Sequence, residues 1–241
     1  MKKFFRAYLV WVLLGLLVLL CVLARLEKGS SLSDFFLFAR RFIERPKAVG
    51  AVAPSSRLLA EALSAYIKPG TALCSYRYLE VGPGTGAVTQ EIVSCLGAND
   101  RLDLVELDEE LANELRKKYA GNAQVQVISG SITQWKPDYL YDGIVMGVPF
   151  NALPLSLVRE IWEHVRALIA DGGVISYFSY LGLAHIKKAL LSKEDKKEFK
   201  KSLRYLQQLC ADYSIGKRKV WANIPPAVVR YLCFMQPVSA Y

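Results

Sequence analysis

The sequence predicts an α/β domain with a mostly parallel sheet, an antiparallel strand pair at its C-terminal end, and one transmembrane helix ahead of the domain. Residues 7–24 form an apolar run without a charged side chain. Apolar segments of strand length then alternate with segments of helical periodicity, which favours a parallel sheet covered by helices on both faces. Near the C-terminus, two strand-like segments are separated by a gap too short for a crossover helix, which predicts antiparallel pairing.

The N-terminal apolar run has 18 residues, and a helix of that length just crosses a hydrocarbon core of roughly 30 Å. A cleaved signal peptide usually has a shorter apolar stretch and a small-x-small cleavage site. Here Val22-Leu23-Ala24 is followed by Arg25. We therefore interpret residues 1–28 as a retained membrane anchor and residues 29–241 as the α/β domain, with a cleaved signal or an interfacial helix as alternatives.

Charge and cysteine usage indicate the compartment and the partners. Basic residues are more numerous after the apolar run than before it, so the positive-inside tendency predicts a cytoplasmic domain. The five cysteines form an odd count without close pairing, as expected of reduced thiols. The net charge is +9, and residues 187–219 hold eleven basic against four acidic side chains. That surplus suits an anionic surface of lipid or nucleic acid, or else a solvated helix face.

The individual elements follow in chain order. A first helix over residues 34–44 carries Phe and Arg side chains, as either an interfacial element or a core helix. Helices are also predicted at residues 57–67, 89–96, 109–119, 155–170 and about 192–211. Strands are predicted at residues 78–81, 101–106, 125–129, 142–146 and 174–178, and the antiparallel pair at 218–222 and 227–234.

The strongest local motif is the segment Tyr78-Leu-Glu-Val-Gly-Pro-Gly-Thr-Gly-Ala-Val, where a strand leads through alternate glycines into a helix. Gly82, Gly84 and Gly86 allow a tight turn and a close approach of the backbone to a ligand. The spacing also satisfies the dinucleotide-binding fingerprint. Glu80, however, is unsuited to a neighbouring pyrophosphate and can instead receive the ammonium of a methionine-like group.

A second carboxylate, Glu106, ends the next predicted strand 22 residues after Gly84. An acid at this place can accept both ribose hydroxyls. Two carboxylates at the ends of neighbouring strands, without a phosphate site, fit the ammonium and ribose of S-adenosylmethionine better than they fit NAD. Glycines in a tight turn beside acids exposed by chance are the structural alternative.

At this point residues 35–241 resemble the small Rossmann-type bacterial phospholipid N-methyltransferases, which are related to the rRNA adenine dimethyltransferases. The resemblance rests on the run from Pro46 to Ala60, on Glu80 to Gly86, on Glu106 and on the run from Asn223 to Ala227. It implies a class I methyltransferase fold with S-adenosylmethionine as cofactor. It also implies transfer of a methyl group to the amine headgroup of an aminophospholipid such as phosphatidylethanolamine.

Two positions depart from the pattern that the resemblance implies. Ser131 stands where an acid usually faces the adenine amino group, so a hydroxyl or backbone groups would have to recognise adenine. The run from Gly147 to Phe150 keeps the proline and the ring of the rRNA enzymes' motif but lacks its amide, and Asn151 follows one step late. The predicted cofactor-binding residues are Glu80, Gly82, Gly84, Gly86, Glu106, Leu107, Ser131, Ile132 and Gly147.

The acceptor site is predicted from polar and aromatic residues at the carboxyl edge of the sheet. Asn151, Tyr177 and Tyr180 are candidates to hold the reacting amine, and Phe150 and Asn223 are candidates to contact the substrate; ordinary packing is the alternative for the tyrosines. The two histidines, His164 and His185, are expected to be structural. No metal site is supported. We expect no nucleic-acid partner; methylation of RNA adenine or of another membrane-borne small molecule, such as a quinone or an aminolipid, is the alternative enzyme hypothesis. A non-catalytic membrane adaptor is the alternative of a different class.

Overall fold

The computed structural model describes residues 53–235, apart from 149, 151–152, 182–192 and 224–225. The predicted anchor, the predicted boundary after residue 28 and the Phe/Arg helix therefore lie outside the described residues, as does Asn151. Within the described part, none of the helices combines the length and the apolar character that crossing a bilayer requires.

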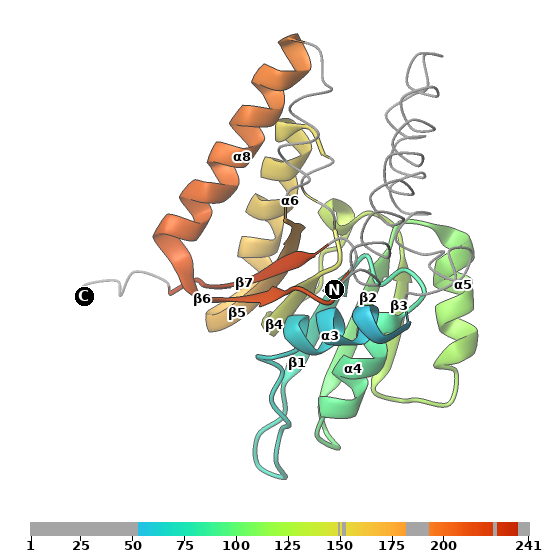
Figure 1. Ribbon diagram of the computed structural model, residues 1–241. Coiled ribbons are helices and arrows are strands. Elements are labelled where there is room, and N and C mark those ends of the chain that lie inside the picture. Colours follow the sequence, from blue (N-terminus) through green and yellow to red (C-terminus); the bar gives the residue numbers. More distant parts are fainter. Residues whose placement is uncertain (1–52, 149, 151–152, 182–192, 224–225, 236–241) are drawn as a thin grey trace, which may run out of the picture. The chain divides into compact units, whose positions relative to one another are not determined.

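A seven-stranded sheet forms the centre of the described structure, with strand order β3-β2-β1-β4-β5-β7-β6 (Figure 1). The first five strands pair in parallel. The last two pair antiparallel, β7 with both β5 and β6. The strands are β1 (Arg77–Val81), β2 (Arg101–Glu106), β3 (Val125–Ser129), β4 (Tyr141–Met146), β5 (Ile169–Tyr180), β6 (Ser214–Val220) and β7 (Ala227–Cys233). The mostly parallel sheet with a C-terminal antiparallel pair is thus confirmed.

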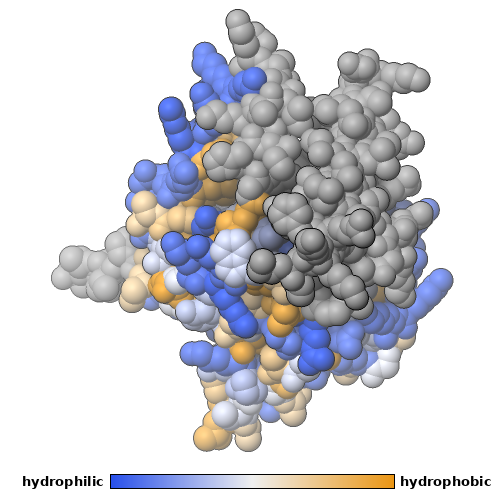
Figure 2. All heavy atoms as spheres, viewed as in Figure 1, coloured by the Kyte–Doolittle hydropathy of each residue, from blue (hydrophilic) through white to orange (hydrophobic). Residues whose placement is uncertain are grey.

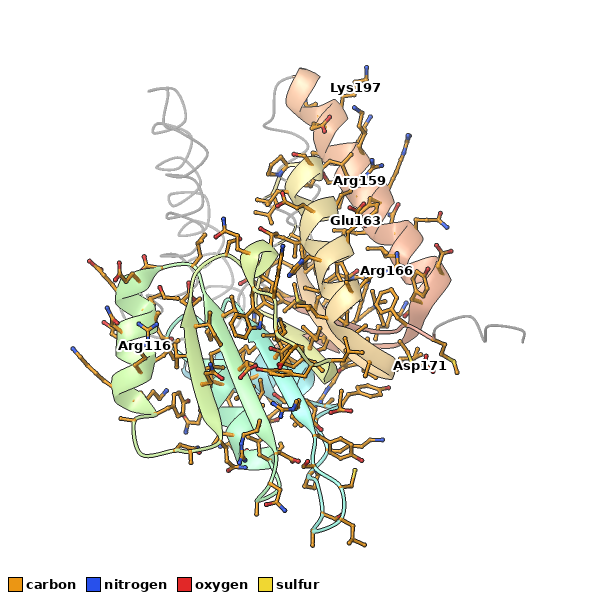
Figure 3. The ribbon with its side chains drawn as sticks, turned by 180° about the vertical axis from the view of Figure 1, so that it is seen from behind. Arg116, Arg159, Glu163, Arg166, Asp171 and Lys197 are labelled. Atoms are coloured by element: carbon orange, nitrogen blue, oxygen red, sulfur yellow. The ribbon has the colours of Figure 1, made fainter. Side chains whose placement is uncertain are left out.

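Helices connect the strands and cover the sheet. They are α3 (Ala53–Leu63), α4 (Ala87–Cys95), α5 (Glu109–Lys118), the short 3-10 helix η2 (Ile132–Gln134), α6 (Leu155–Leu168) and α8 (Lys193–Tyr213). The core between α3, α4, α5 and the sheet includes Leu63, Ile92, Leu115, Phe178 and Val229. On the opposite face α6 and α8 lie side by side (Figures 1 and 3). Side-chain alternation along each strand supplies both faces with apolar groups.

Several boundaries differ from the sequence-based prediction, among them those of α3, which begins and ends four residues early. The starts of two strands differ for identifiable reasons. Helix α6 ends at Leu168 and β5 begins directly at Ile169, although the apolar pattern resumes only at Val174. Between Ile169 and Val174 the register of pairing with β4 shifts, and Gly172 adopts a φ of 74°. Strand β6 begins at Ser214, four residues earlier than predicted; the prediction missed this start because most of the strand is exposed at the edge of the sheet and shows no buried apolar pattern.

The order of the elements determines which helix and strand ends lie at the carboxyl edge of the sheet. Helix α8 follows β5 and leads into β6, and β6 runs parallel to β5 because both are antiparallel to β7. The N-terminal end of α8 and the C-terminal end of β6 therefore lie on the same side of the sheet as the carboxyl ends of the parallel strands. In open α/β sheets this carboxyl edge is where ligands bind.

Candidate active site

The loop between β1 and α4 is shaped by its three glycines. Gly82, Gly84 and Gly86 have φ values of 69°, 59° and 77°, a left-handed conformation that costs side-chain-bearing residues energy. Gly86 also serves as the N-cap of α4. A Cβ on Gly86 would lie 2.9 Å from Leu115 Cδ2 of α5, so a larger residue would also have to displace that side chain. The loop presents the first turn of α4 at the carboxyl edge, where N–H groups and the helix dipole favour an electron-rich ligand.

Glu106, at the end of β2, joins two neighbouring loops through one carboxylate. Its Oε2 accepts a hydrogen bond of 2.9 Å from the Gly84 N–H, and its Oε1 accepts one of 2.9 Å from the Asp108 N–H. The residue is only 3% exposed. Because each carboxylate oxygen can accept more than one hydrogen bond, this geometry holds the group rigid and leaves it able to accept ligand hydroxyls. Next to it, Leu107 is 66% exposed, an apolar side chain free to cover a planar ring.

Glu80 lies behind the glycine loop and is 1% exposed. Its Oε2 accepts a short hydrogen bond of 2.6 Å from Thr89 Oγ1 in the first turn of α4. Burial raises the pKa of Glu80 to about 8, against the opposing effect of the Thr89 hydrogen bond, and the nearby Glu106 raises it further. The protonated and ionised forms are therefore both accessible near neutral pH, and a cationic ligand group would stabilise the ionised form.

The end of α5 supports the loop, which the sequence analysis did not predict. Lys118 Nζ donates to the carbonyls of Thr85 and Gly86 at 3.5 and 3.4 Å. Its charge also lowers the pKa of Glu80. Thr89 is the other contact that was missed. Its position in the first turn after the glycines was the available signal, whereas nothing in the sequence singles out Lys118 among the basic residues that end α5.

The end of β4 approaches the glycine loop closely. A Cβ on Gly147 would lie 2.4 Å from the Gly82 carbonyl oxygen and 3.1 Å from that of Val81, so only glycine fits there. The Gly147 N–H donates to the Val81 carbonyl at 2.8 Å. The predicted site residues of β1 and β4 are thus brought together.

After β3, the side chain of Ser131 is engaged in local structure. It caps η2 by accepting a hydrogen bond of 3.3 Å from the Thr133 N–H, and its hydroxyl lies 3.0 Å from Thr133 Oγ1. The neighbouring Ile132 is 6% exposed and packs in the core. Both residues stand at the carboxyl edge, and their assignment to adenine recognition stays a prediction.

An aromatic cluster fills the space between β5 and α6. Phe150, 1% exposed, stacks on Trp162 with ring centroids 5.2 Å apart. Tyr177 meets both rings edge-on at 5.9 and 5.3 Å, and its hydroxyl lies 2.9 Å from Cys210 Sγ of α8. Burial raises the pKa of Tyr177 strongly. The structure therefore gives Phe150 and Tyr177 a packing role; contact with substrate stays a prediction for both.

Tyr180 and Asn223 lie where the acceptor site is predicted. Tyr180 is the last residue of β5 and pairs with Ala227 at the start of β7, and burial raises its pKa to about 12. Asn223 is 5% exposed in the connection between β6 and β7. Because Tyr177 and Tyr180 are three residues apart on one strand, they face opposite sides of the sheet. His164 is structural in position, with Nε2 2.7 Å from the Trp135 carbonyl.

These residues fit S-adenosylmethionine as cofactor. The glycine loop admits close backbone approach, Glu106 presents a held carboxylate, and Glu80 is a buried acid that a cationic group would ionise. Residues for the methionine end and for the nucleoside end thus lie on adjacent strands. Among the described residues, no group of three His, Cys, Asp or Glu side chains is arranged to hold a metal ion, and the described cysteines are free thiols.

The strand order and the paired acids at the carboxyl edge define the class: the chain is a class I S-adenosylmethionine-dependent methyltransferase. Two solved structures of this fold superpose on most of it. The N-methyltransferase NodS from Bradyrhizobium japonicum, in complex with S-adenosyl-L-homocysteine, has a TM-score of 0.56 at 13% identity and covers 79% of this chain and 92% of its own. The O-methyltransferase TomG from Streptomyces achromogenes, in complex with SAM, has a TM-score of 0.56 at 16% identity, covering 84% and 88%.

The sequence relatives are methyltransferases of two kinds, which act on a lipid or on ribosomal RNA according to their names. The family described as "Ribosomal RNA adenine dimethylase" matches residues 65–169. An ornithine lipid N-methyltransferase from Singulisphaera acidiphila is 28% identical over 151 residues, which covers 60% of this chain and 77% of that protein. A ribosomal RNA small subunit methyltransferase A from Parasynechococcus marenigrum is 37% identical over 82 residues, but the match covers only 32% of this chain and 26% of that protein. The chain is thus similar to a lipid N-methyltransferase and related to rRNA dimethylases.

Proposed function

We propose that this protein transfers a methyl group from S-adenosylmethionine to the amine headgroup of a membrane aminolipid, with an aminophospholipid such as phosphatidylethanolamine as the expected substrate. The observation that carries the proposal is the extent of the two similarities. The match to the ornithine lipid enzyme spans 77% of that protein. The match to the rRNA enzyme is confined to 26% of its length.

The residues at the end of β4 support the same choice. The rRNA enzymes that the sequence resembles hold a flipped adenine with an amide and an aromatic ring after this strand. Here Gly147 occupies the position of the amide, and the ring of Phe150 is stacked on Trp162 inside the molecule. The described residues therefore offer no exposed ring at this place on which a base could stack.

The chemistry that the protein must provide is positioning. The bound cofactor supplies an electrophilic methyl carbon on a sulfonium. A neutral amine attacks that carbon, so that a C–N bond forms as the C–S bond breaks, and the proton that the new ammonium loses passes to water. The glycine loop and Glu106 would orient the nucleoside, and Tyr180 and Asn223 would hold the amine. Fixing two reactants in this way contributes several kcal/mol to the barrier reduction.

Radiolabel transfer tests the proposal. The full-length protein is incubated with methyl-labelled S-adenosylmethionine and with vesicles of phosphatidylethanolamine, of an ornithine lipid or of phosphatidylcholine, and the lipids are separated by headgroup. We expect label in an aminolipid and none in phosphatidylcholine. Glu106→Ala serves as the inactive reference and Glu114→Ala, on the exposed face of α5, as the matched control. Label in rRNA but in no lipid would overturn the proposal in favour of RNA methylation.

A further inference from the structure

The outward face of α8 is strongly basic near its N-terminal end. Five cations line one open groove there: Lys196, Lys197, Lys200, Lys201 and Arg204. The opposite face of the helix is buried and includes Phe199, Leu206 and Leu209. One cation of the groove has an acidic partner in the described structure, since Lys201 lies 3.1 Å from Glu198. Figure 2 shows hydrophilic side chains along α8, and Figure 3 shows Lys197 pointing outward near the free end of the helix.

A second feature lies at the end of β6. Trp221 follows the strand directly and is 66% exposed, and Lys219 Nζ lies 5.5 Å from its ring centroid. Lys217 and Lys219 are both exposed. Of the other described tryptophans, Trp162 is fully buried and Trp135 is half-buried, with its indole N–H bonded to Tyr141. Exposure of a large aromatic surface next to cations therefore distinguishes this corner.

Both features stand at the edge of the sheet that carries the cofactor site. The groove lies in the first turns of α8, which begins after the carboxyl end of β5, and Trp221 follows the carboxyl end of β6. Lys217 and Lys219 pair with Arg230 and Val228. Arg230 also lies beneath the Tyr177 ring, which packs towards α8. The cations of β6 and of α8 therefore share one face of the sheet.

We infer that this rim, formed by Lys196, Lys197, Lys200, Lys201, Arg204, Lys217, Lys219 and Trp221, rests on an anionic lipid leaflet and turns the carboxyl edge towards the bilayer. Lysines gain free energy near anionic headgroups, and tryptophan prefers the headgroup level, where its ring is half apolar and its N–H stays hydrated. A single exposed ring suits a membrane better than single-stranded RNA, which needs a series of stacking surfaces. The inference rests on the proposed function, because a lipid headgroup reaches the site only if that edge faces the membrane.

Quenching of Trp221 fluorescence tests the inference in the full-length chain. All forms carry Trp11→Phe, so that the N-terminal segment gives no signal, and the protein is placed in nanodiscs of brominated phosphatidylcholine with or without phosphatidylglycerol. The Trp221 contribution is the difference from a Trp221→Phe form. The test variant is Lys197→Gln/Lys200→Gln/Lys201→Gln. Its matched control is Arg116→Gln/Lys117→Gln/Lys136→Gln, which removes the same charge elsewhere.

We expect bromolipid to quench Trp221 in the anionic nanodiscs, and expect the test variant or high salt to reduce the quenching at least about twofold. The control variant should behave as the parent. Absence of quenching, or equal quenching in test and control variants, would overturn the inference, as would lysine-dependent binding of an RNA oligomer without quenching. Quenching in a protein that methylates no lipid would contradict the proposed function alone. Lipid methylation that the test variant leaves unchanged, without quenching, would contradict this inference alone.

Discussion

The two halves of the carboxyl edge are built on different principles. The cofactor half, residues 80–108, holds its geometry through backbone groups: glycines with positive φ and a carboxylate that accepts N–H groups from Gly84 and Asp108. The acceptor half, of which residues 147, 148, 150, 153, 177–181 and 223 are described, is held by packed rings such as those of Phe150 and Trp162. A loop that depends on backbone geometry can be formed by few sequences, whereas many combinations of side chains can fill the same packed volume.

This difference explains how one fold serves different acceptors. The family match ends at residue 169. It includes the whole cofactor half and the acceptor residues that follow β4, but it stops before the acceptor residues of β5 and of the β6–β7 connection. The named relatives carry either an ornithine lipid or ribosomal RNA in their descriptions. A fold can change its substrate by varying the acceptor half while the cofactor half is kept.

The largest effect is expected from the carboxylate that joins the two cofactor loops. Glu106→Ala removes the predicted acceptor for cofactor hydroxyls and takes the carboxylate away from the buried Gly84 N–H and the partly buried Asp108 N–H, so we expect affinity for S-adenosylhomocysteine to fall at least about 100-fold. Isothermal titration calorimetry measures the affinity, and circular dichroism checks that the domain stays folded. Glu114→Ala should bind as the parent does. Unchanged affinity in Glu106→Ala would remove this residue from the site.

A pH-dependent effect on stability should come from Glu80. Its pKa is raised from 4.5 to about 8 in the folded protein, so between these values the native state binds more protons than the unfolded chain. The contribution of this group to stability is fully present below about pH 4.5 and is lost as the pH rises towards 8, by roughly 3 kcal/mol between pH 5 and pH 8. Glu80→Gln keeps an oxygen for Thr89 and should remove this loss. Urea unfolding at pH 5 and pH 8 measures it, and an identical pH dependence in both forms would contradict the assignment.

A somewhat smaller loss of stability is expected at the contact between the halves. In Gly147→Ala the new Cβ meets the Gly82 carbonyl, a backbone atom that cannot swing aside. We expect the free energy of unfolding to fall by about 2 kcal/mol and cofactor binding to weaken with it. Gly121→Ala, where nothing lies within 4 Å, should stay within about 0.5 kcal/mol. Equal stability of the two variants in urea unfolding would show that the strand ends are not in close contact.

The smallest effects should separate the two tyrosines of the acceptor half. Tyr180→Phe removes a hydroxyl at the end of β5, and we expect turnover of the aminolipid to fall about tenfold. Tyr177→Phe removes a hydroxyl that faces α8, and we expect turnover within about threefold of the parent and a stability loss of about 1 kcal/mol or less. Steady-state rates with each variant decide the point. A larger loss in Tyr177→Phe would move the reacting amine to the other face of the sheet.

The fold could be predicted from the sequence because its signals are local. The bounds of β2 and β3 agree with the prediction to the residue, since each is an apolar run with clear ends. The gap before Ala227 correctly predicts an antiparallel return. The start of β5 at Ile169 was missed because its pairing crosses Asp171, Gly172 and Gly173, which carry no strand pattern.

The candidate site could be predicted only in part. Glu80, Glu106 and the glycines are recognisable because their spacing to a strand end places them at one edge. Lys118 and Thr89 act through contacts that only the fold creates. Grouping Tyr177 with Tyr180 overlooked the two-residue period of a strand, which sends them to opposite faces. The burial of Phe150 depends on Trp162 of α6, a partner that no local pattern identifies.

Strand β6 is the edge of the described sheet and carries Lys217, Arg218 and Lys219 in succession. An unpaired edge strand is a template for pairing with another chain, and the hazard grows where proteins are confined to the plane of a membrane. Two copies that met along β6 would bring three cations from each into register. Repulsion between these cations therefore disfavours pairing of two copies along β6.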